Sequence, residues 1–347
     1  MPDKTITYKD AGVHIDTANV LIGKIKTLVK RTHRSEVLSS IGHYAGLFEL
    51  GRKKYKNPVL VASTDGVGTK LKLALDWNNL TGLGQDLVAM SANDILCMGA
   101  TPLFFLDYLA TGKIDLTQST ILLQGITEAC RDLHCALLGG ETAEMPVLYQ
   151  SGDFDLAGFM VGVVEKNEII DGSKIKVGDH IIGLASNGPH SNGFSLIRKI
   201  VALNNLQPDS LYTPLEKPLA DLLLEPTRLY VNTILKLKSA FDLHGIAHIT
   251  GGGLIENLPR LFPARCGAII DRRAWKRPTL FQKIQEWGNI SEDEMQRVFN
   301  CGIGLMLVVP AGQSEKILKR LHTLREKAWV IGEIVPRKKT AEPLQIL

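Results

Sequence analysis

Short apolar segments rich in β-branched and aromatic residues alternate along the chain with longer segments of helical periodicity. The predicted strands are residues 59–63, 103–110, 136–138, 156–164, 180–185, 246–249, 267–270, 305–309 and 329–335. The predicted helices are residues 21–29, 85–98, 116–133, 194–203, 227–236, 254–261, 280–287 and 313–327. Ser291 and Glu294 have the spacing of a capping box, which predicts one more helix after Ser291. This alternation favours an α/β fold.

The length of 347 residues suggests two domains, because a domain has about 150 residues. The segment 166–179 is polar, contains glycine and carries charges of both signs, which is typical of a connection between domains. We therefore predict an N-terminal domain at residues 1–168 and a C-terminal domain at residues 169–347.

Composition excludes several classes of protein. Apolar residues make up 45% and charged residues 22%, which argues against a disordered chain, a collagen-like fibre or a coiled coil. The formal charge of +4 is too small to indicate nucleic acid or a membrane surface as the main partner. The five cysteines form no C-x-x-C pair and are expected to be buried thiols. With no apolar signal segment near the start, we expect a cytoplasmic protein.

Eleven of the 32 glycines gather in groups, most of them just after a predicted strand or just before a predicted helix. They lie at Gly66 and Gly68, Gly139 and Gly140, Gly188 and Gly193, Gly251 to Gly253, and Gly302 and Gly304. Glycine allows a positive φ and lets backbone N–H groups approach an anion closely. Tight turns alone explain about half of these positions, because any α/β fold needs them. The usual P-loop and dinucleotide-binding patterns are absent from the sequence, so phosphate binding would need another arrangement.

Acidic residues stand beside the glycines of the first half. Asp65 follows the first predicted strand and precedes Gly66, Gly68, Thr69 and Lys70. A carboxylate beside free N–H groups and a lysine suits a Mg²⁺-bound polyphosphate, although an Asp-Gly turn with a solvated lysine is the alternative.

Two further groups of polar residues could supply the missing metal ligands. Asp86, Asn93 and Asp94 interrupt an otherwise apolar helix, where they are either oxygen ligands or hydrogen-bond partners. Glu141 and Glu144 follow Gly139 and Gly140. In a loop that opens a helical turn, both carboxylates would point the same way. A solvated loop is the alternative.

Two glycine turns of the second half are predicted to bind anions. His190, Ser191 and Asn192 lie between a strand and a helix, and His190 is the best acid–base or phosphate-contact candidate. A histidine hydrogen-bonded within a turn is an equal alternative. Thr250 and Gly251 to Gly253 form the second such turn. This division suggests ATP and metal in the first domain and a phosphorylated substrate in the second.

Together, these motifs resemble the phosphoribosylformylglycinamidine cyclo-ligase family, the aminoimidazole ribonucleotide synthetases of purine biosynthesis. The motifs that carry the resemblance are residues 8–13, 63–70, 84–90, 103–110, 139–146, 155–159, 190–193, 225–228, 248–259 and 299–304. Small departures fall at Ser91, at Val147 and at Pro189, and none removes an expected ligand.

The resemblance implies a two-domain α/β fold of the AIR-synthetase type and a homodimer in which the N-terminal sheets pair into a barrel. It also implies ring closure of formylglycinamidine ribonucleotide to 5-aminoimidazole ribonucleotide, with conversion of ATP to ADP and phosphate. Mg²⁺ would accompany ATP, and a need for K⁺ is left open. Neither nucleic acid nor membrane is an expected partner.

The residue assignments that follow are hypotheses. The expected metal ligands are Asp65, Asp94, Glu141 and Glu144, and the expected catalytic residues are His190, Asp65 and Asp94. The expected ATP- and phosphate-binding residues are Gly66, Gly68, Thr69, Lys70, Gly139, Gly140, Ser191, Asn192, Thr250, Gly251, Gly252 and Gly253.

Related ATP-dependent enzymes are the alternatives. A selenophosphate synthetase usually has a reactive cysteine near its start, whereas the first cysteine here is Cys97. A hydrogenase-maturation relative would end in a functional cysteine, and this chain ends at Leu347. A thiamine-monophosphate kinase is a further alternative. An RNA-binding module would need a basic face with stacking aromatics, but aromatic residues make up only 6%.

Overall fold

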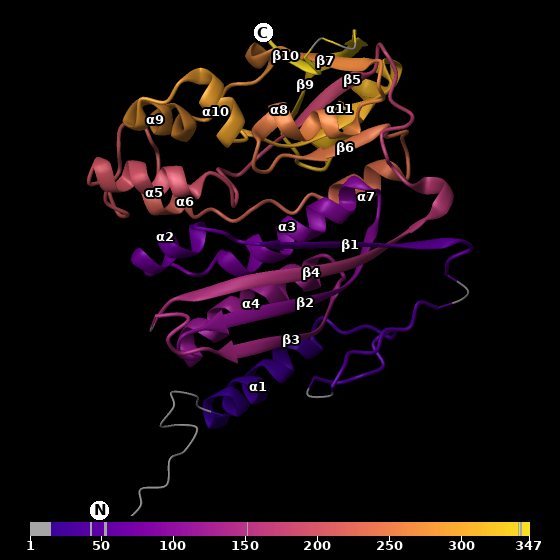
Figure 1. The fold of residues 1–347 in the computed structure, drawn as a ribbon. Coiled ribbons are helices and arrows are strands. Elements are labelled where there is room, and N and C mark those ends of the chain that lie inside the picture. Colours follow the sequence, from indigo (N-terminus) through magenta and orange to yellow (C-terminus); the bar gives the residue numbers. More distant parts are fainter. Residues whose placement is uncertain (1–14, 42–43, 52–53, 151, 339, 341) are drawn as a thin grey trace, which may run out of the picture. The chain divides into compact units, whose positions relative to one another are not determined.

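The computed structural model describes residues 15–41, 44–51, 54–150, 152–338, 340 and 342–347 (Figure 1). The chain divides into two compact units. The first unit comprises residues 1–56, 62–91 and 102–162, and the second comprises residues 57–61, 92–101 and 163–347. The main change of unit follows residue 162, and two short segments of the first half also belong to the second unit.

A four-stranded sheet is the centre of the first unit. Its strand order is β1-β4-β2-β3, and β2 and β3 run parallel. The strands are β1 (Pro58–Gly66), β2 (Thr101–Thr111), β3 (Ala136–Glu144) and β4 (Phe154–Glu165). Strand β2 alternates buried and partly exposed residues along much of its length, because successive side chains point to opposite faces.

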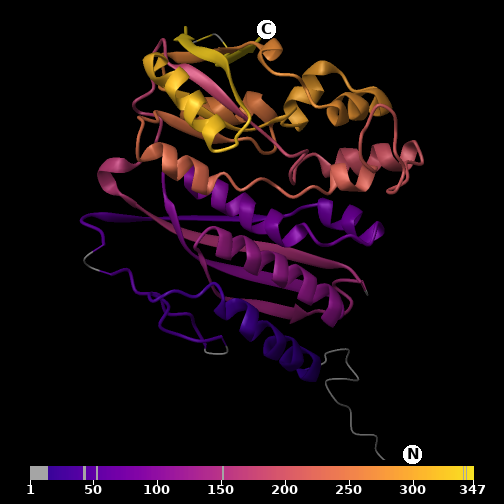
Figure 2. The same ribbon diagram turned by 180° about the vertical axis from the view of Figure 1, so that it is seen from behind.

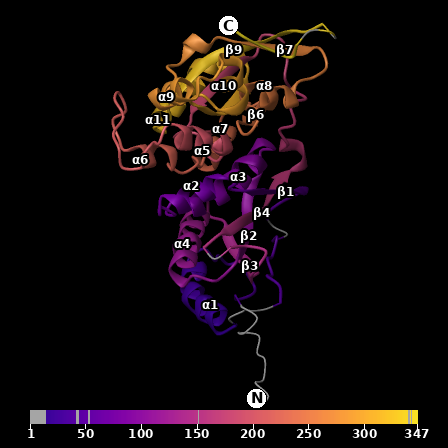
Figure 3. The same ribbon diagram turned by 60° about the vertical axis from the view of Figure 1, so that its left-hand side comes forward.

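Four helices accompany this sheet, namely α1 (Ile15–Lys30), α2 (Lys70–Asp76), α3 (Leu83–Cys97) and α4 (Leu116–Asp132). Helix α4 lies along one face of the sheet (Figure 2) and packs against α1 (Figure 3). Asp115 starts α4 by accepting hydrogen bonds from the N–H groups of Thr117 and Gln118. Helices α3 and α4 meet at Gly84 and Gly125. A Cβ on Gly84 would overlap the backbone of α4, so this contact requires glycine.

The second unit is built on a mixed six-stranded sheet with the order β10-β7-β9-β5-β8-β6. Strands β5 (His180–Ala185), β6 (Gly245–His248), β7 (Cys266–Ile270), β8 (Ile303–Val309) and β9 (Ala328–Pro336) form antiparallel pairs, and β10 (Leu344–Ile346) runs parallel to β7. Every residue of β8 is buried, which places this strand in the core.

The helices of the second unit are short and amphipathic. They are α5 (Phe194–Leu203), α6 (Leu219–Leu223), α7 (Val231–Lys238), α8 (Gly253–Asn257), α9 (Thr279–Gly288), α10 (Glu292–Val298) and α11 (Ser314–Thr323). The capping prediction at Ser291 is confirmed, because its Oγ accepts the N–H of Glu294. Within the described ranges, no helix is both long enough and apolar enough to cross a membrane. All five cysteines are free thiols, and four of them are buried as expected, whereas Cys97 is half-buried.

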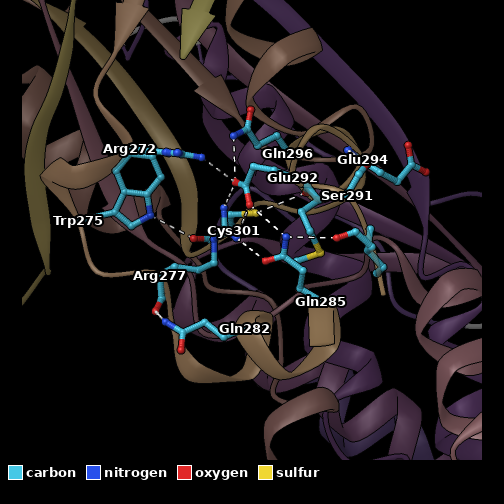
Figure 4. A network of polar contacts seen from close by, with 12 residues as sticks. Arg272, Trp275, Arg277, Gln282, Gln285, Ser291, Glu292, Glu294, Gln296 and Cys301 are labelled. Atoms are coloured by element: carbon cyan, nitrogen blue, oxygen red, sulfur yellow. Dashed lines mark hydrogen bonds and ion pairs between the residues drawn. The ribbon is translucent and has the colours of Figure 1, made fainter. Parts of the chain in front are cut away.

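A polar network around Glu292 holds α9 and α10 together (Figure 4). Arg277 binds both carboxylate oxygens of Glu292, and Gln285 and Gln296 each donate to the same carboxylate, at 3.1 and 3.0 Å. The hydrogen bonds from Arg277 are the main reason that the pKa of Glu292 falls from 4.5 to about 2. The nearby Trp275 indole donates to the carbonyl of Cys301 at 3.1 Å.

Replacing Glu292 by Gln is expected to destabilise the protein by about 1–2 kcal/mol at pH 7. The shift of its pKa sets an upper bound of ~3 kcal/mol, and partial exposure of the carboxylate reduces the effect. Because the folded-state pKa is lowered, this stabilisation is present above about pH 4.5 and is lost as the pH falls toward 2. Urea unfolding of both proteins at pH 7 and pH 3 measures the difference, which should shrink at pH 3.

Glu286 provides the control for this substitution. Its side chain is 65% exposed and pairs with Lys283 on the same helix, so Glu286→Gln should change stability by less than about 0.5 kcal/mol. Equal effects of the two substitutions would contradict a stabilising role of the Glu292 network.

Candidate active site

The first glycine turn of the first unit follows β1 directly. Asp65 is the second-last residue of β1, and its Oδ1 accepts the N–H of Gly66 at 2.8 Å. Gly68 has a φ of +67°, and Gly68 and Thr69 are exposed. The turn therefore presents a half-buried carboxylate beside an exposed backbone at the point where the strand ends.

Lys70 differs from the expectation of a phosphate contact. Its ammonium forms an ion pair with Asp86 Oδ2 at 2.7 Å, and both side chains are completely buried. The pair joins the start of α2 to α3 inside the first unit. Asp86 therefore serves as a polar partner inside the unit, the second of the two alternatives that the sequence left open for it.

Glu141 and Glu144 lie within β3, not in a loop that opens a helical turn. Because side chains alternate across a strand, two residues three positions apart point to opposite faces. Glu144 Oε1 accepts the N–H of Ile114 at 2.9 Å, whereas Glu141 is exposed. The expected pair of parallel carboxylates is therefore not formed.

Asp107 is a candidate site residue that the sequence interpretation missed. It pairs with Gly140 in the β2–β3 register, and a Cβ on Gly140 would overlap the Asp107 carboxylate. Burial is the main reason that the pKa of Asp107 rises to about 7, and the Glu141 carboxylate raises it further. An aspartate inside a predicted apolar strand was the signal that could have identified it.

The last turns of α3 belong to the second unit and carry two polar residues. Asn93 donates to the carbonyl of Arg228 at 2.9 Å and accepts the N–H of Tyr230 at 3.1 Å. This fully buried amide therefore holds the segment before α7 and is not a metal ligand. Asp94 Oδ1 lies 2.9 Å from His248 Nδ1, at the end of β6.

The glycine loop 250–253 follows His248 and is held by Asn257. The buried amide of Asn257 donates to the carbonyl oxygens of Thr250, Gly251 and Gly253, at 3.3, 3.2 and 2.7 Å. Gly252 has a φ of +92°, and a Cβ on Gly253 would overlap the carbonyl of Gln296. These glycines are therefore needed for the shape of the loop itself.

The loop 187–193 lies next to this glycine loop in the second unit. Asn300 ties it to the sheet by donating to the carbonyl of Gly188 at 2.8 Å and accepting the Ser186 hydroxyl at 3.0 Å. The hydroxyls of Ser191 and Thr227 lie 3.2 Å apart. A Cβ on Gly251 would lie 3.8 Å from Asn192 Oδ1, which brings the two loops together.

His190 is completely buried beneath its loop and has a φ of +62°. Its Nε2 accepts the N–H of Asn187 at 3.3 Å, and its ring lies 6.3 Å from that of Tyr230. In this structure the imidazole therefore stabilises the turn by accepting a backbone hydrogen bond within it. Its predicted contact with phosphate stays a prediction.

The expected metal site of Asp65, Asp94, Glu141 and Glu144 draws on both units and stays a prediction. Among the residues that the structure describes, no three His, Cys, Asp or Glu side chains are placed to hold a metal ion together. Glu144 Oε1 accepts a backbone N–H, and Asp94 Oδ1 contacts His248. Such a donor set fits a hard cation that keeps its waters and arrives with substrate phosphates.

Two α/β units with glycine-rich turns beside carboxylates define a class of two-domain proteins represented in solved structures. The thiamine-monophosphate kinase of Stenotrophomonas maltophilia has a TM-score of 0.70 and 19% identity, covering 93% of this chain and 95% of that one. The E. coli hydrogenase maturation protein HypE has a TM-score of 0.67 and 16% identity, covering 94% and 92%. At these identities the likeness establishes the fold alone.

Sequence comparison identifies the family. Residues 42–164 match the N-terminal domain of the AIR synthase related proteins, and residues 176–344 match the C-terminal domain. A phosphoribosylformylglycinamidine cyclo-ligase of Geobacter sulfurreducens is 53% identical over the full length of both chains. One from Geotalea daltonii is 55% identical over 96% of each chain. The chain therefore belongs to the phosphoribosylformylglycinamidine cyclo-ligase family.

Proposed function

We propose that the chain converts formylglycinamidine ribonucleotide and ATP to 5-aminoimidazole ribonucleotide, ADP and phosphate. The observation that carries this function is identity of 51–55% to three cyclo-ligases over 96–100% of the chain. Identity at this level over both domains supports a shared activity, whereas the solved structures at 16–19% identity support only a shared fold. The enzyme is accordingly an ATP-dependent ligase that forms a C–N bond in purine biosynthesis.

The reaction needs ATP because an amide oxygen is a poor leaving group. Transfer of the γ-phosphoryl group to the formyl oxygen gives a carbon that the amidine nitrogen of the same molecule can attack. The C–N bond closes the five-membered ring as the C–O bond breaks and phosphate leaves. Holding both reacting groups within one bound molecule lowers the entropic part of the barrier.

Asp65 and Glu141 of the first unit are the carboxylates that we propose for Mg²⁺. Both offer oxygen donors, and Asp65 is next to the exposed turn of Gly66, Gly68 and Thr69. Asp94 is left out of this set because it belongs to the second unit, where its Oδ1 contacts His248. When bound, Mg²⁺ would neutralise charge on the transferring phosphoryl group.

The loops of the second unit are proposed to bind the substrate phosphate. This proposal is supported by the way Asn257 and Asn300 hold the two loops in place. The loops carry the partly exposed residues Ser191, Asn192 and Thr250. Backbone N–H groups in such loops suit a phosphate. His190 would act from beneath by holding the shape of loop 187–193.

A homodimer formed through the N-terminal sheets is also proposed. Strand β1 is an edge strand with alternating exposed residues, and Leu60 on it is 60% exposed. An apolar edge of this kind favours pairing with a second copy. Sedimentation equilibrium should give twice the chain mass, and a single-chain mass at assay concentration would contradict the dimer.

The choice of phosphoryl acceptor tests the function. When formylglycinamidine ribonucleotide is supplied with ATP and Mg²⁺, ADP should form, and the amount of aminoimidazole product should equal the amount of ADP. Thiamine monophosphate, the substrate named by a solved relative of the same fold, should give no ADP above background. The opposite preference would overturn the cyclo-ligase function in favour of a kinase.

A further inference from the structure

His248 has one ring nitrogen with a partner and one without. Its side chain is 2% exposed, and its Nδ1 lies 2.9 Å from Asp94 Oδ1. Because a carboxylate only accepts, Nδ1 must carry the proton in this hydrogen bond. The buried Nε2 has no hydrogen-bond partner among the described residues. Leaving a buried polar atom unpaired destabilises the fold, so its persistence calls for an explanation.

Asn192 has a second unpartnered atom in the same unit. Its buried Nδ2 likewise finds no hydrogen-bond partner among the described residues. Asn192 lies beside Gly251, and His248 precedes the same glycine loop by two residues in sequence. Both unpartnered atoms therefore belong to the region of the proposed substrate loops, since Asn192 is part of loop 187–193 and His248 lies just before loop 250–253.

The two atoms require opposite partners. With Nδ1–H given to Asp94, Nε2 is the ring atom left for a ligand, and without a proton it accepts a hydrogen bond. The Asn192 amide nitrogen is a donor. A ligand that satisfies both must offer a hydrogen-bond donor, such as an N–H group, and an acceptor, such as an oxygen atom. A phosphate alone offers only acceptor oxygens when it is fully ionised.

We propose that His248 is a further catalytic residue of ring closure, with Nε2 accepting a hydrogen bond from the attacking amidine nitrogen of the substrate. Asn192 donates to an oxygen of the same molecule. This inference rests on the proposed function, because the amidine belongs to that substrate. Asp94 is a positioning residue that fixes the tautomer and the orientation of the imidazole.

The step is balanced within the bound molecules. The amidine nitrogen forms the C–N bond with its lone pair and loses its proton to His248 Nε2. The C–O bond to the phosphorylated oxygen breaks, and phosphate leaves with the bonding electron pair. Phosphoryl transfer from ATP precedes this step and does not require His248.

Single-turnover kinetics separate the two steps. In rapid-quench experiments with γ-labelled ATP, His248→Ala should form ADP at nearly the wild-type rate. It should form aminoimidazole product about 10²–10⁴-fold more slowly, the range for loss of a general acid–base group. Exposed His322 on α11 gives the matched control, and His322→Ala should leave both rates unchanged.

Several outcomes would overturn the inference. If ADP and product formation fell together in His248→Ala, the residue would serve ATP binding or the fold. If His248→Ala did not fold, Asp94→Asn would be tested in its place. It should likewise form ADP at nearly the wild-type rate and form aminoimidazole product more slowly. Loss of ADP formation in Asp94→Asn would assign the carboxylate to the nucleotide instead. If the wild type made no aminoimidazole, the proposed function itself would fail, which keeps the two failures distinct.

Discussion

Asp65→Asn should lower turnover by about 10²–10³-fold while the protein stays folded, the range seen when one electrostatic contact to a transition state is removed. Asp65 ends β1 beside the exposed turn, and an amide there cannot supply the negative charge that Mg²⁺ prefers. Its hydrogen bond to the adjacent Gly66 N–H can be made by an asparagine oxygen, so the fold should tolerate the change. Product formation at a series of Mg²⁺ concentrations measures the effect.

Asp76 is the matched control on the neighbouring helix α2. Its side chain is 49% exposed and lies 3.8 Å from Lys72 on the helix surface. Asp76→Asn should therefore keep wild-type turnover at every Mg²⁺ concentration. Wild-type turnover in Asp65→Asn at low Mg²⁺ would remove Asp65 from the metal site.

Lys70→Met is expected to have the largest effect on stability, about 3–5 kcal/mol. The substitution leaves the completely buried Asp86 carboxylate without the ammonium at 2.7 Å. Removing both charges in Lys70→Met with Asp86→Leu should recover most of the loss, because neither charge then needs compensation. Urea unfolding of the two single variants and the double variant gives the coupling free energy.

Lys72 supplies the control for this cycle. Lys72 lies two residues after Lys70 on α2, is 45% exposed and pairs with Asp153 at 2.9 Å. Because this pair is exposed to solvent, Lys72→Met should cost less than about 1 kcal/mol. A comparably small cost for Lys70→Met would show that its charge is solvated, which is the alternative that the sequence analysis left open.

The fold follows closely from local sequence pattern. Strand β5 and helix α5 begin and end at the predicted residues, and the Ser291 cap starts α10 where expected. The pattern failed at β3, because Gly139 and Gly140 look like turn residues. The parallel ladder with β2 continues through them, and Asp107 opposite Gly140 leaves no room for a side chain. The three-residue β10 is too short to show a period.

The candidate site was less predictable because its contacts join distant parts of the chain. Lys70 beside glycines is typical of a phosphate ligand, and only the folded structure shows that Asp86 neutralises it. The Asp94–His248 contact spans 154 positions, so no local spacing indicates it. Asn257 and Asn300 carry no local signal either, although they fix the two loops of the second unit.

If ATP drives ring closure by phosphorylating the formyl oxygen, the oxygen atom of that formyl group must leave in the phosphate, and isotope transfer measures this directly. Formylglycinamidine ribonucleotide labelled with ¹⁸O in its formyl group would be converted by the wild-type enzyme with ATP and Mg²⁺. The label should appear in the released phosphate, in amounts equal to the aminoimidazole product. Product formed with unlabelled phosphate, and the label in water, would contradict the mechanism.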